Sequence, residues 1–271
     1  MVKINMNGVL SLPGRGSTSF FFTQMGEEGF SRGQQSYIYE LIRTYRMRFP
    51  ELEITGVWDF GMEEGTRYES RQRGVFRDCR DNAVFNSATL SIAYNHIRVS
   101  RMPSDLSPGE LDRILQEYEV TAALSRMAAR MWEELRSAGV PPVQIRERVR
   151  EEAAQVWKRH FPEAAGMEKG PHNALLLEDP LFADVRAIRQ LEESMNIRRL
   201  TVHELGHALA DLYGVLKDRR IRKLFAACRD GFEDRDEFCA ECFMASELTD
   251  AIPLANRVAA VYRERAGVQE K

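Results

Sequence analysis

The sequence is poor in cysteine and has no disulfide framework. Its 271 residues contain four cysteines, which is too few for a disulfide scaffold. Cys239 and Cys242 have the Cys-x-x-Cys spacing of some redox and zinc sites, but no second such pair and no preceding βαβ pattern accompanies them. We therefore interpret these thiols as small buried hydrophobic side chains. The other two cysteines are Cys79 and Cys228.

Long apolar runs and an excess of one charge are also absent. Residues 1–8 lack the uninterrupted apolar core of a signal peptide, and no other stretch is long and apolar enough to span a bilayer. Lys and Arg number 38 against 41 Asp and Glu, a net charge of −3, so nothing suggests a nucleic-acid or membrane surface. We expect a cytoplasmic protein with no nucleic-acid or membrane partner.

Only five histidines are present, and two of them belong to the most informative motif, His203-Glu204-Leu205-Gly206-His207. Residues four apart on an α-helix lie on the same face, so both imidazoles can reach one metal ion. Glu204 lies about 100° round the helix from His203, where a carboxylate can hold a water on the metal. The motif predicts half of a zinc site, with Glu204 as the general base.

The residues around the motif favour a helix that is buried on the opposite face. At about 100° per residue, an apolar stripe lies nearly opposite the histidines. Its members are Val202, Leu205, Leu209, Leu212 and Leu216. A purely structural alternative makes Thr201 and Glu204 a capping box that begins a helix. The apolar periodicity continues back to Leu191, however, and predicts one long helix that begins near Leu181.

The third zinc ligand has to come from another segment. Asp211 lies eight residues beyond His203, about 12 Å along a helix, which is too far to share a metal with it. We expect Asp211 to form a hydrogen bond to a ligating residue instead. The pattern HExxHxxGxxH also fails, because Ala210 and Tyr213 stand where it requires Gly and His.

Residues 234–245 supply candidate carboxylates. Read as a helix, this segment is apolar almost all round, except that Glu237 and Glu241 lie one turn apart on one face. Buried carboxylates are costly unless they are paired or bind a metal. We predict Glu237 as the third ligand and Glu241 as the hydrogen-bond partner of a ligating imidazole. In the alternative, Asp234 caps the helix, Glu237 closes a capping box and Glu241 is solvated.

The two segments HELGHALADLYG and EFCAECFMASELTD together resemble a group of gluzincin-type zinc peptidases, which includes the catalytic domain of anthrax lethal factor and the clostridial Pro-Pro endopeptidases. In that family an HExGH helix is followed by a helix with the sequence E-F-F-A-E-A-F. The resemblance covers about the last third of the chain. It implies a peptide or protein substrate, one zinc ion as cofactor and a possible toxin or effector role. It assigns His203, His207 and Glu237 as ligands, Glu204 as base and Glu241 as the partner of a ligand.

One departure from the family concerns the oxyanion. Those peptidases place a tyrosine shortly before the ligand glutamate, whereas this chain has no Tyr between Gly214 and Asp250. The matching position is Asp230, which as an anion cannot stabilise another anion. The residues left open as substitutes are Tyr213, Tyr262, His172, Arg229 and Arg235.

The order of predicted elements indicates the α+β class and a zincin-like architecture in a single domain, residues 1–271. Residues 1–104 read as a small mixed sheet with a backing helix at 34–48. We expect residues 90–99 to form the sheet edge along which a substrate strand adds. Residues 105–180 read as a helical insertion, with charged amphipathic helices at 111–137 and 143–160 that we interpret as packing elements. Residues 181–271 contain the active-site helix, the glutamate helix and a C-terminal helix.

These predictions lead to two hypotheses of function. In the first, the protein is a zinc-dependent endopeptidase that uses a metal-activated water and Glu204 as the base. In the second, it is a catalytically silent interaction or structural module in which zinc only fastens two helices. The missing tyrosine favours the second hypothesis. Glu204 favours the first, because a structural site has no use for a base.

Overall fold

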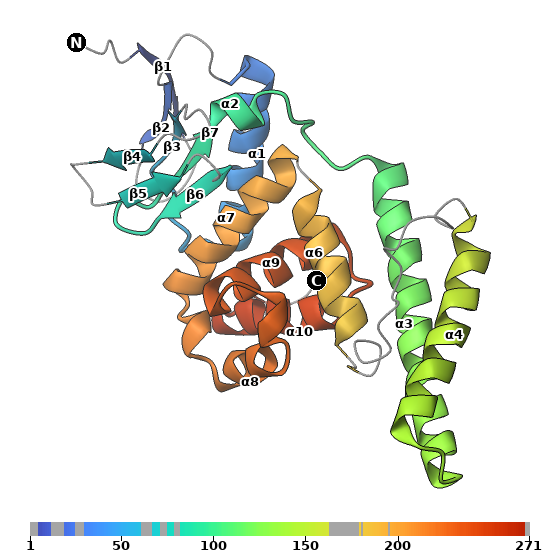
Figure 1. Ribbon diagram of the computed structural model, residues 1–271. Coiled ribbons are helices and arrows are strands. Elements are labelled where there is room, and N and C mark those ends of the chain that lie inside the picture. The colour runs from blue at the N-terminus through green and yellow to red at the C-terminus, as the bar shows by residue number, and fades with distance from the viewer. Residues whose placement is uncertain are drawn as a thin grey trace.

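The structure combines a mixed β-sheet from the N-terminal part of the chain with helices from the remainder (Figure 1). It is a computed structural model, and it describes residues 5–11, 19–24, 30–60, 67–70, 75–78, 82–162, 179, 181–194 and 196–268. The α+β class predicted from the sequence is confirmed. No helix in these ranges is long and apolar enough to cross a membrane.

The main sheet has five strands in the order β1-β2-β3-β7-β6. Their bounds are Asn5–Ser11 (β1), Ser19–Gln24 (β2), Gly56–Phe60 (β3), Ser91–Asn95 (β7) and Ala83–Asn86 (β6). β3 is parallel to both of its neighbours, whereas the outer pairs β1–β2 and β6–β7 are antiparallel. The strand β6 therefore forms the sheet edge that faces the helices.

Two predictions for the sheet are wrong. The expected edge at residues 90–99 is an interior strand, because β7 pairs with β3 on one side and β6 on the other, and all of its residues are buried. The chain leaves the sheet after Asn95 and forms the short helix α2 (His96–Val99), so the strand ends before residue 99. A separate two-stranded antiparallel sheet is formed by β4 (Arg67–Ser70) and β5 (Val75–Asp78).

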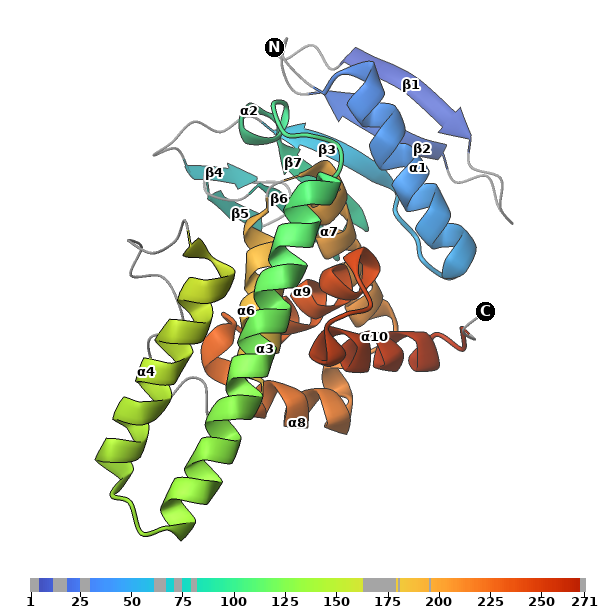
Figure 2. The same ribbon diagram turned by 90° about the vertical axis from the view of Figure 1, so that its right-hand side faces the viewer.

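The helix α1 (Arg32–Arg48) packs against the sheet, as Figure 2 shows. Its start is defined by a capping box, in which the Ser31 side chain accepts a hydrogen bond from the Gln34 backbone N–H and the Gln34 side chain accepts one from Ser31. Ile38 and Ile42 are fully buried in the same apolar cluster as Val57 of β3. The predicted backing helix is confirmed.

The predicted single long helix from Leu181 is wrong, because the chain breaks into α6 (Phe182–Glu193) and α7 (Ile197–Leu212). The Asn196 side chain caps α7 by accepting a hydrogen bond from the Arg199 backbone N–H at 2.8 Å. Leu191 and Ile197 are both fully buried, which explains why the apolar pattern runs through the break. Thr201 lies inside α7 and donates to the Ile197 carbonyl at 2.8 Å, so it does not begin the helix.

The two charged helices form an antiparallel hairpin that projects from the body (Figures 1 and 2). They are α3 (Pro108–Ser137) and α4 (Pro142–His160), and they share an apolar cluster separate from the main core. The hairpin meets the body through α6, where Arg186 and Glu117 form an ion pair at 2.6 Å. The following loop, including His172, lies outside the described residues except for a few positions.

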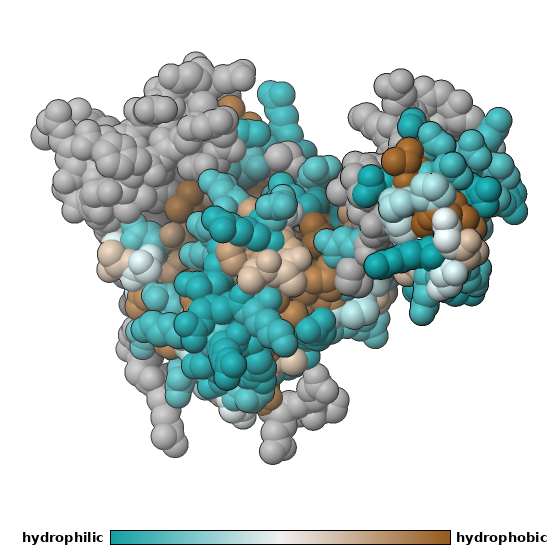
Figure 3. All heavy atoms as spheres, turned by 60° about the horizontal axis from the view of Figure 1, so that its bottom comes forward, coloured by the Kyte–Doolittle hydropathy of each residue, from teal (hydrophilic) through white to brown (hydrophobic). Residues whose placement is uncertain are grey.

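The C-terminal part contains helices and no strand among the residues described. Its elements are η2 (Val215–Lys217), α8 (Arg219–Ala227), η3 (Arg229–Gly231), α9 (Arg235–Leu248) and α10 (Pro253–Arg265). The helix α8 buries Ile221 and Leu224, and the surface around it is mainly hydrophilic (Figure 3). In contrast, α9 is buried from Phe238 to Ala245. Cys239 and Cys242 are buried free thiols of α9, as is Cys228 after α8, whereas Cys79 lies outside the described residues.

Candidate metal centre

A close contact between α7 and α9 brings the two predicted motifs together. A Cβ atom on Gly206 would lie 3.0 Å from the Ala240 Cα, so the glycine lets the two helices approach closely without a shift of a few tenths of an ångström. The buried Tyr262 hydroxyl donates to the Gly206 carbonyl at 3.2 Å and ties α10 to the same point. This packing places the histidine face of α7 against the first turns of α9.

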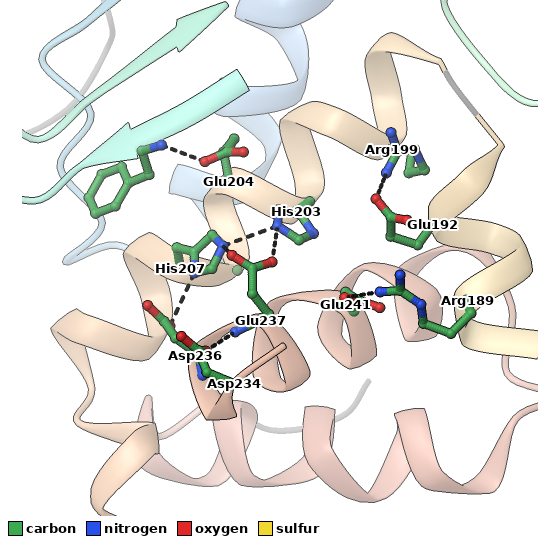
Figure 4. Close-up of polar contacts among 12 residues, drawn as sticks. Arg189, Glu192, Arg199, His203, Glu204, His207, Asp234, Asp236, Glu237 and Glu241 are labelled. Carbon is green, nitrogen blue, oxygen red and sulfur yellow. Dashed lines mark hydrogen bonds and ion pairs between the residues drawn. The ribbon is translucent and has the colours of Figure 1, made fainter. Parts of the chain in front are cut away.

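His203, His207 and Glu237 meet at this contact (Figure 4). The two imidazole Nε2 atoms lie 3.0 Å apart, and the Glu237 carboxylate oxygens lie 3.2 Å from His203 Nε2 and 3.5 Å from His207 Nε2. Zinc bonds of about 2.0–2.1 Å at tetrahedral angles would separate the ligand atoms by roughly 3.3 Å. The three donor atoms therefore fit a tetrahedral zinc ion, and the donor set of two histidines and one carboxylate suits that metal.

Glu204 lies on the flank of α7 that faces the sheet. Its carboxylate is 5% exposed, and Oε2 accepts a hydrogen bond from the Phe85 backbone N–H of β6 at 2.5 Å. Burial raises the pKa of Glu204, whereas the neighbouring imidazoles and the Phe85 N–H act against this rise. The carboxylate thus lies between the edge strand and the histidines and has an increased affinity for a proton.

Asp236, rather than Asp211, forms the hydrogen bond to a candidate ligand. The His207 Nδ1 donates to the Asp236 carboxylate at 3.1 Å. Burial acts to lower the pKa of His207, but Asp236 and Glu237 raise it to about 11. The expected hydrogen bond from Asp211 to a ligand is not formed among the described residues, because Asp211 is exposed at the end of α7 and Asp236 holds the His207 Nδ1.

Glu241 forms an ion pair with Arg189 of α6 instead of a hydrogen bond to an imidazole. The distance is 2.7 Å, and the Glu241 side chain is almost completely buried. Its other oxygen and His203 Nδ1 are both buried without a hydrogen-bond partner in the structure. The predicted hydrogen bond from Glu241 to a ligating imidazole is therefore not formed among the described residues, because Arg189 of α6 pairs with the Glu241 carboxylate. Burial raises the pKa of Glu241 to about 8 despite the Arg189 charge.

The alternative reading of α9 is correct only for its cap. The Asp234 carboxylate accepts hydrogen bonds from the backbone N–H groups of Asp236 at 2.7 Å and Glu237 at 3.0 Å. The Glu237 side chain is directed toward the histidines (Figure 4), and Glu241 is not solvated.

The three donor atoms open into a cleft of about 530 Å³ between β6 and the helices. One wall is formed by residues 82–85 and Ser87, and the histidine face of α7 forms another. Glu192 of α6 and Glu233, which precedes α9, complete the lining together with Asp211 and Leu216. A second cavity of about 420 Å³ adjoins it and shares Glu192, Glu233 and Glu237.

The oxyanion substitutes proposed from the sequence do not line this cleft in the described part of the chain. Tyr262 is fully buried with its hydroxyl on Gly206, and Tyr213 packs against the ring of Phe49. Arg229 and Arg235 are not among the residues of the cleft wall, and His172 lies outside the described residues. Asp230 lines only the adjoining cavity.

Sequence reasoning did not identify Arg199 as a residue of the cleft. It lies four residues before His203, so the same helical spacing that relates the histidines also places Arg199 on their face. It forms an ion pair with Glu192 at 3.0 Å. Comparison of the chain with models of protein families, with curated proteins and with solved structures gave no match.

Proposed function

We propose that this protein is a zincin-like, zinc-dependent endopeptidase of the gluzincin type. The observation that supports the proposal most strongly is the convergence of His203, His207 and Glu237 from two helices, at distances that fit a tetrahedral metal, beside the buried Glu204. A zinc ion held by these residues supplies a Lewis acid that lowers the pKa of a water molecule and polarises a carbonyl group.

Glu204 is the proposed general base. Its carboxylate takes a proton from the attacking water and passes it to the departing amine. A general base works best when its pKa lies near the working pH, and burial moves the pKa of Glu204 in that direction. The hydrogen bond from Phe85 holds one carboxylate oxygen in place and links the base to the edge strand.

The edge strand β6 is the proposed docking site for an extended peptide. β6 pairs with β7 on one side only, and its residues form a wall of the cleft. A peptide that adds as a further strand would pass over the histidine face, with its scissile carbonyl above the candidate metal ligands. In this proposal β6 takes the docking role that the sequence predicted for residues 90–99.

A catalytically silent module fastened by zinc is the second candidate. It is favoured by one observation: within the described residues, no tyrosine hydroxyl lines the cleft. In that case the protein would bind zinc but cleave no peptide.

Metal analysis beside a peptidase assay separates the two candidates. The purified protein is expected to contain about one zinc per chain and to cleave members of a random peptide pool. A chelator should abolish cleavage, and His207→Ala serves as the matched variant without a complete site. Zinc at full occupancy with no cleavage of any peptide would support the silent module.

A further inference from the structure

Arg199 is a buried cation with spare hydrogen-bond donors in the cleft wall. Its side chain is 2% exposed and forms one side-chain hydrogen bond, from Nη1 to Glu192 at 3.0 Å. The Nε atom is buried and has no hydrogen-bond partner. A guanidinium carries five N–H groups and cannot lose its charge, so a single partner leaves most of its capacity unused. Arg186 and Arg235 also have a buried Nε without a partner, but neither lines the cleft.

The cleft around Arg199 is otherwise acidic. Among the described residues that line the cleft, Arg199 is the only lysine or arginine. The acidic residues of the lining are Glu192, Glu204, Asp211, Glu233, Asp236 and Glu237. A carboxylate on a bound molecule would be repelled by these groups over most of the cleft. Apart from a metal ion at the candidate ligands, Arg199 offers the positive charge of this lining.

The distance between Arg199 and the candidate metal ligands determines which substrate residue would carry the carboxylate. Arg199 lies six residues before the midpoint of His203 and His207, about 9 Å along the axis of α7. In Figure 4 the Arg199–Glu192 pair lies beyond His203. Asp236 lies at the opposite end of the site, next to His207. An extended peptide advances about 3.3 Å per residue, so this distance corresponds to two or three residues. β6, on which the peptide would pair, runs in much the same direction as α7 (Figures 1 and 4).

We propose that Arg199 forms a carboxylate-binding subsite, which selects peptides with a carboxylate two or three residues from the scissile bond, on one side only. The inference rests on the proposed peptidase function for its reference to a scissile bond. Glu192 is 29% exposed and holds Nη1 in the free protein, so an incoming carboxylate would displace the Glu192 side chain from the guanidinium or share it with Glu192. Two N–H groups in a fork match the two oxygens of a carboxylate. The carboxylate belongs either to an acidic side chain or to the C-terminus of the substrate.

The test measures binding first, so that it does not depend on turnover. Zinc-loaded Glu204→Gln protein is titrated with labelled peptide pools in which Glu or Gln occupies each position in turn. Each pool is made with a free and with an amidated C-terminus, which distinguishes a side-chain carboxylate from a terminal one. The expected preference for the carboxylate is roughly 10- to 100-fold at one or two adjacent positions, as for hydrogen bonds to charged groups. The same ratio is then measured as kcat/KM with the protein that has Glu204.

Three variants decide whether Arg199 causes the preference. Arg199→Met should reduce the ratio to about one, and Arg199→Lys should leave a few-fold ratio, since an ammonium cannot bind in the bidentate manner. Arg186→Met is the matched control, because Arg186 pairs with Glu117 away from the cleft, and it should leave the ratio unchanged. Melting temperatures show which variants fold. If Arg199→Met does not fold, Arg199→Lys still provides the test.

The outcomes separate this inference from the proposed function. A carboxylate preference that Arg199→Lys reduces and Arg186→Met does not would support the subsite, even if no peptide is cleaved. The absence of cleavage would then count against the peptidase alone. Equal binding of Glu and Gln peptides at every position, with either C-terminus, would overturn the inference, as would a preference that Arg199→Lys and Arg199→Met leave intact.

Discussion

At the scale of single residues, the candidate site depends on which carboxylates surround the histidines. Glu237 faces both imidazoles, and Asp236 accepts a hydrogen bond from His207. The two imidazoles hold the pKa of Glu237 well below its usual range, although burial acts in the opposite direction. These contacts give different roles to acidic residues that are close in sequence.

Zinc affinity should follow those roles. His207→Ala and Glu237→Ala remove a donor atom and should abolish tight binding. Asp236→Asn weakens the orientation of His207 and should reduce affinity about 10- to 100-fold. Asp211→Asn is the matched control, since the exposed Asp211 side chain forms no hydrogen bond or ion pair with a candidate ligand among the described residues, and the zinc affinity of this variant should stay within about twofold of the unmodified protein. Competition with a chromophoric chelator measures all four. A large loss in Asp211→Asn beside an unchanged Asp236→Asn would reverse the assignment.

Zinc binding should release protons. In the metal-free protein the pKa of His207 is raised to about 11, so its imidazole carries an extra proton near pH 7.5 that has to leave when Nε2 binds zinc. Affinity should therefore fall as the pH is lowered. Calorimetry in two buffers of different ionisation enthalpy should show release of about one proton per site. Asp236→Asn removes one cause of the raised pKa and should release fewer protons, whereas buffer-independent heats would contradict the expectation.

At the scale of elements, the site exists because α7 and α9 touch at Gly206 and Ala240. Gly206 has an ordinary helical backbone conformation, and the reason for a glycine at this position is the close approach of α9. The contact sets the distance from the two histidines to Glu237, so a wider spacing should affect zinc binding as well as stability.

Gly206→Ala should destabilise the fold. Alanine is a better helix former than glycine by about 1 kcal/mol, but its Cβ would lie 3.0 Å from the Ala240 Cα and would push α9 away by a few tenths of an ångström, and overpacking in a well-packed core costs about 1–3 kcal/mol. Weaker zinc binding should accompany the lower melting temperature. Gly109→Ala in α3 is the control, because a Cβ there meets nothing within 4 Å, and it should be neutral or slightly stabilising. A Gly206→Ala protein with unchanged stability and zinc affinity would show that the helix contact does not set the site.

The sequence predicted the helices of the site better than their connections. The spacing of His203 and His207 within one helix and that of Glu237 and Glu241 within another are local features, and the structure brings His203, His207 and Glu237 together. The break before α7 was not predictable from apolar spacing, because Leu191 and Ile197 are buried in one core on either side of it. The partner of Glu241 depends on where that break directs α6. Contacts of this kind are set by tertiary packing and leave no trace in local periodicity.

At the scale of the whole molecule, two apolar clusters are separate. The larger one joins the sheet, α1 and the helices of the candidate site, whereas the smaller one lies within the α3–α4 hairpin. The hairpin meets the body through α6. Local unfolding of the hairpin should therefore leave the metal centre intact.

Leu124→Ala tests this separation. Leu124 is 1% exposed in the hairpin cluster, and truncation of a buried leucine typically costs 2–5 kcal/mol. Hydrogen exchange should accelerate in α3 and α4, with little change in α7 and α9 and with zinc affinity preserved. Leu209→Ala in the main core is the matched substitution, and it should accelerate exchange throughout α7 and α9. Equal effects of both variants on both regions would mean that the molecule unfolds as one unit.

The most direct test of the peptidase proposal is the turnover of Glu204→Gln. The substitution preserves the size of the side chain and removes its basic oxygen, so zinc content and melting temperature should match those of the unmodified protein. Turnover on any cleaved peptide should fall by about 10²- to 10⁴-fold, toward the upper end because one residue serves both the water and the amine. Unchanged turnover with zinc retained would contradict Glu204 as the base, and no turnover by either protein on any peptide would contradict the peptidase itself.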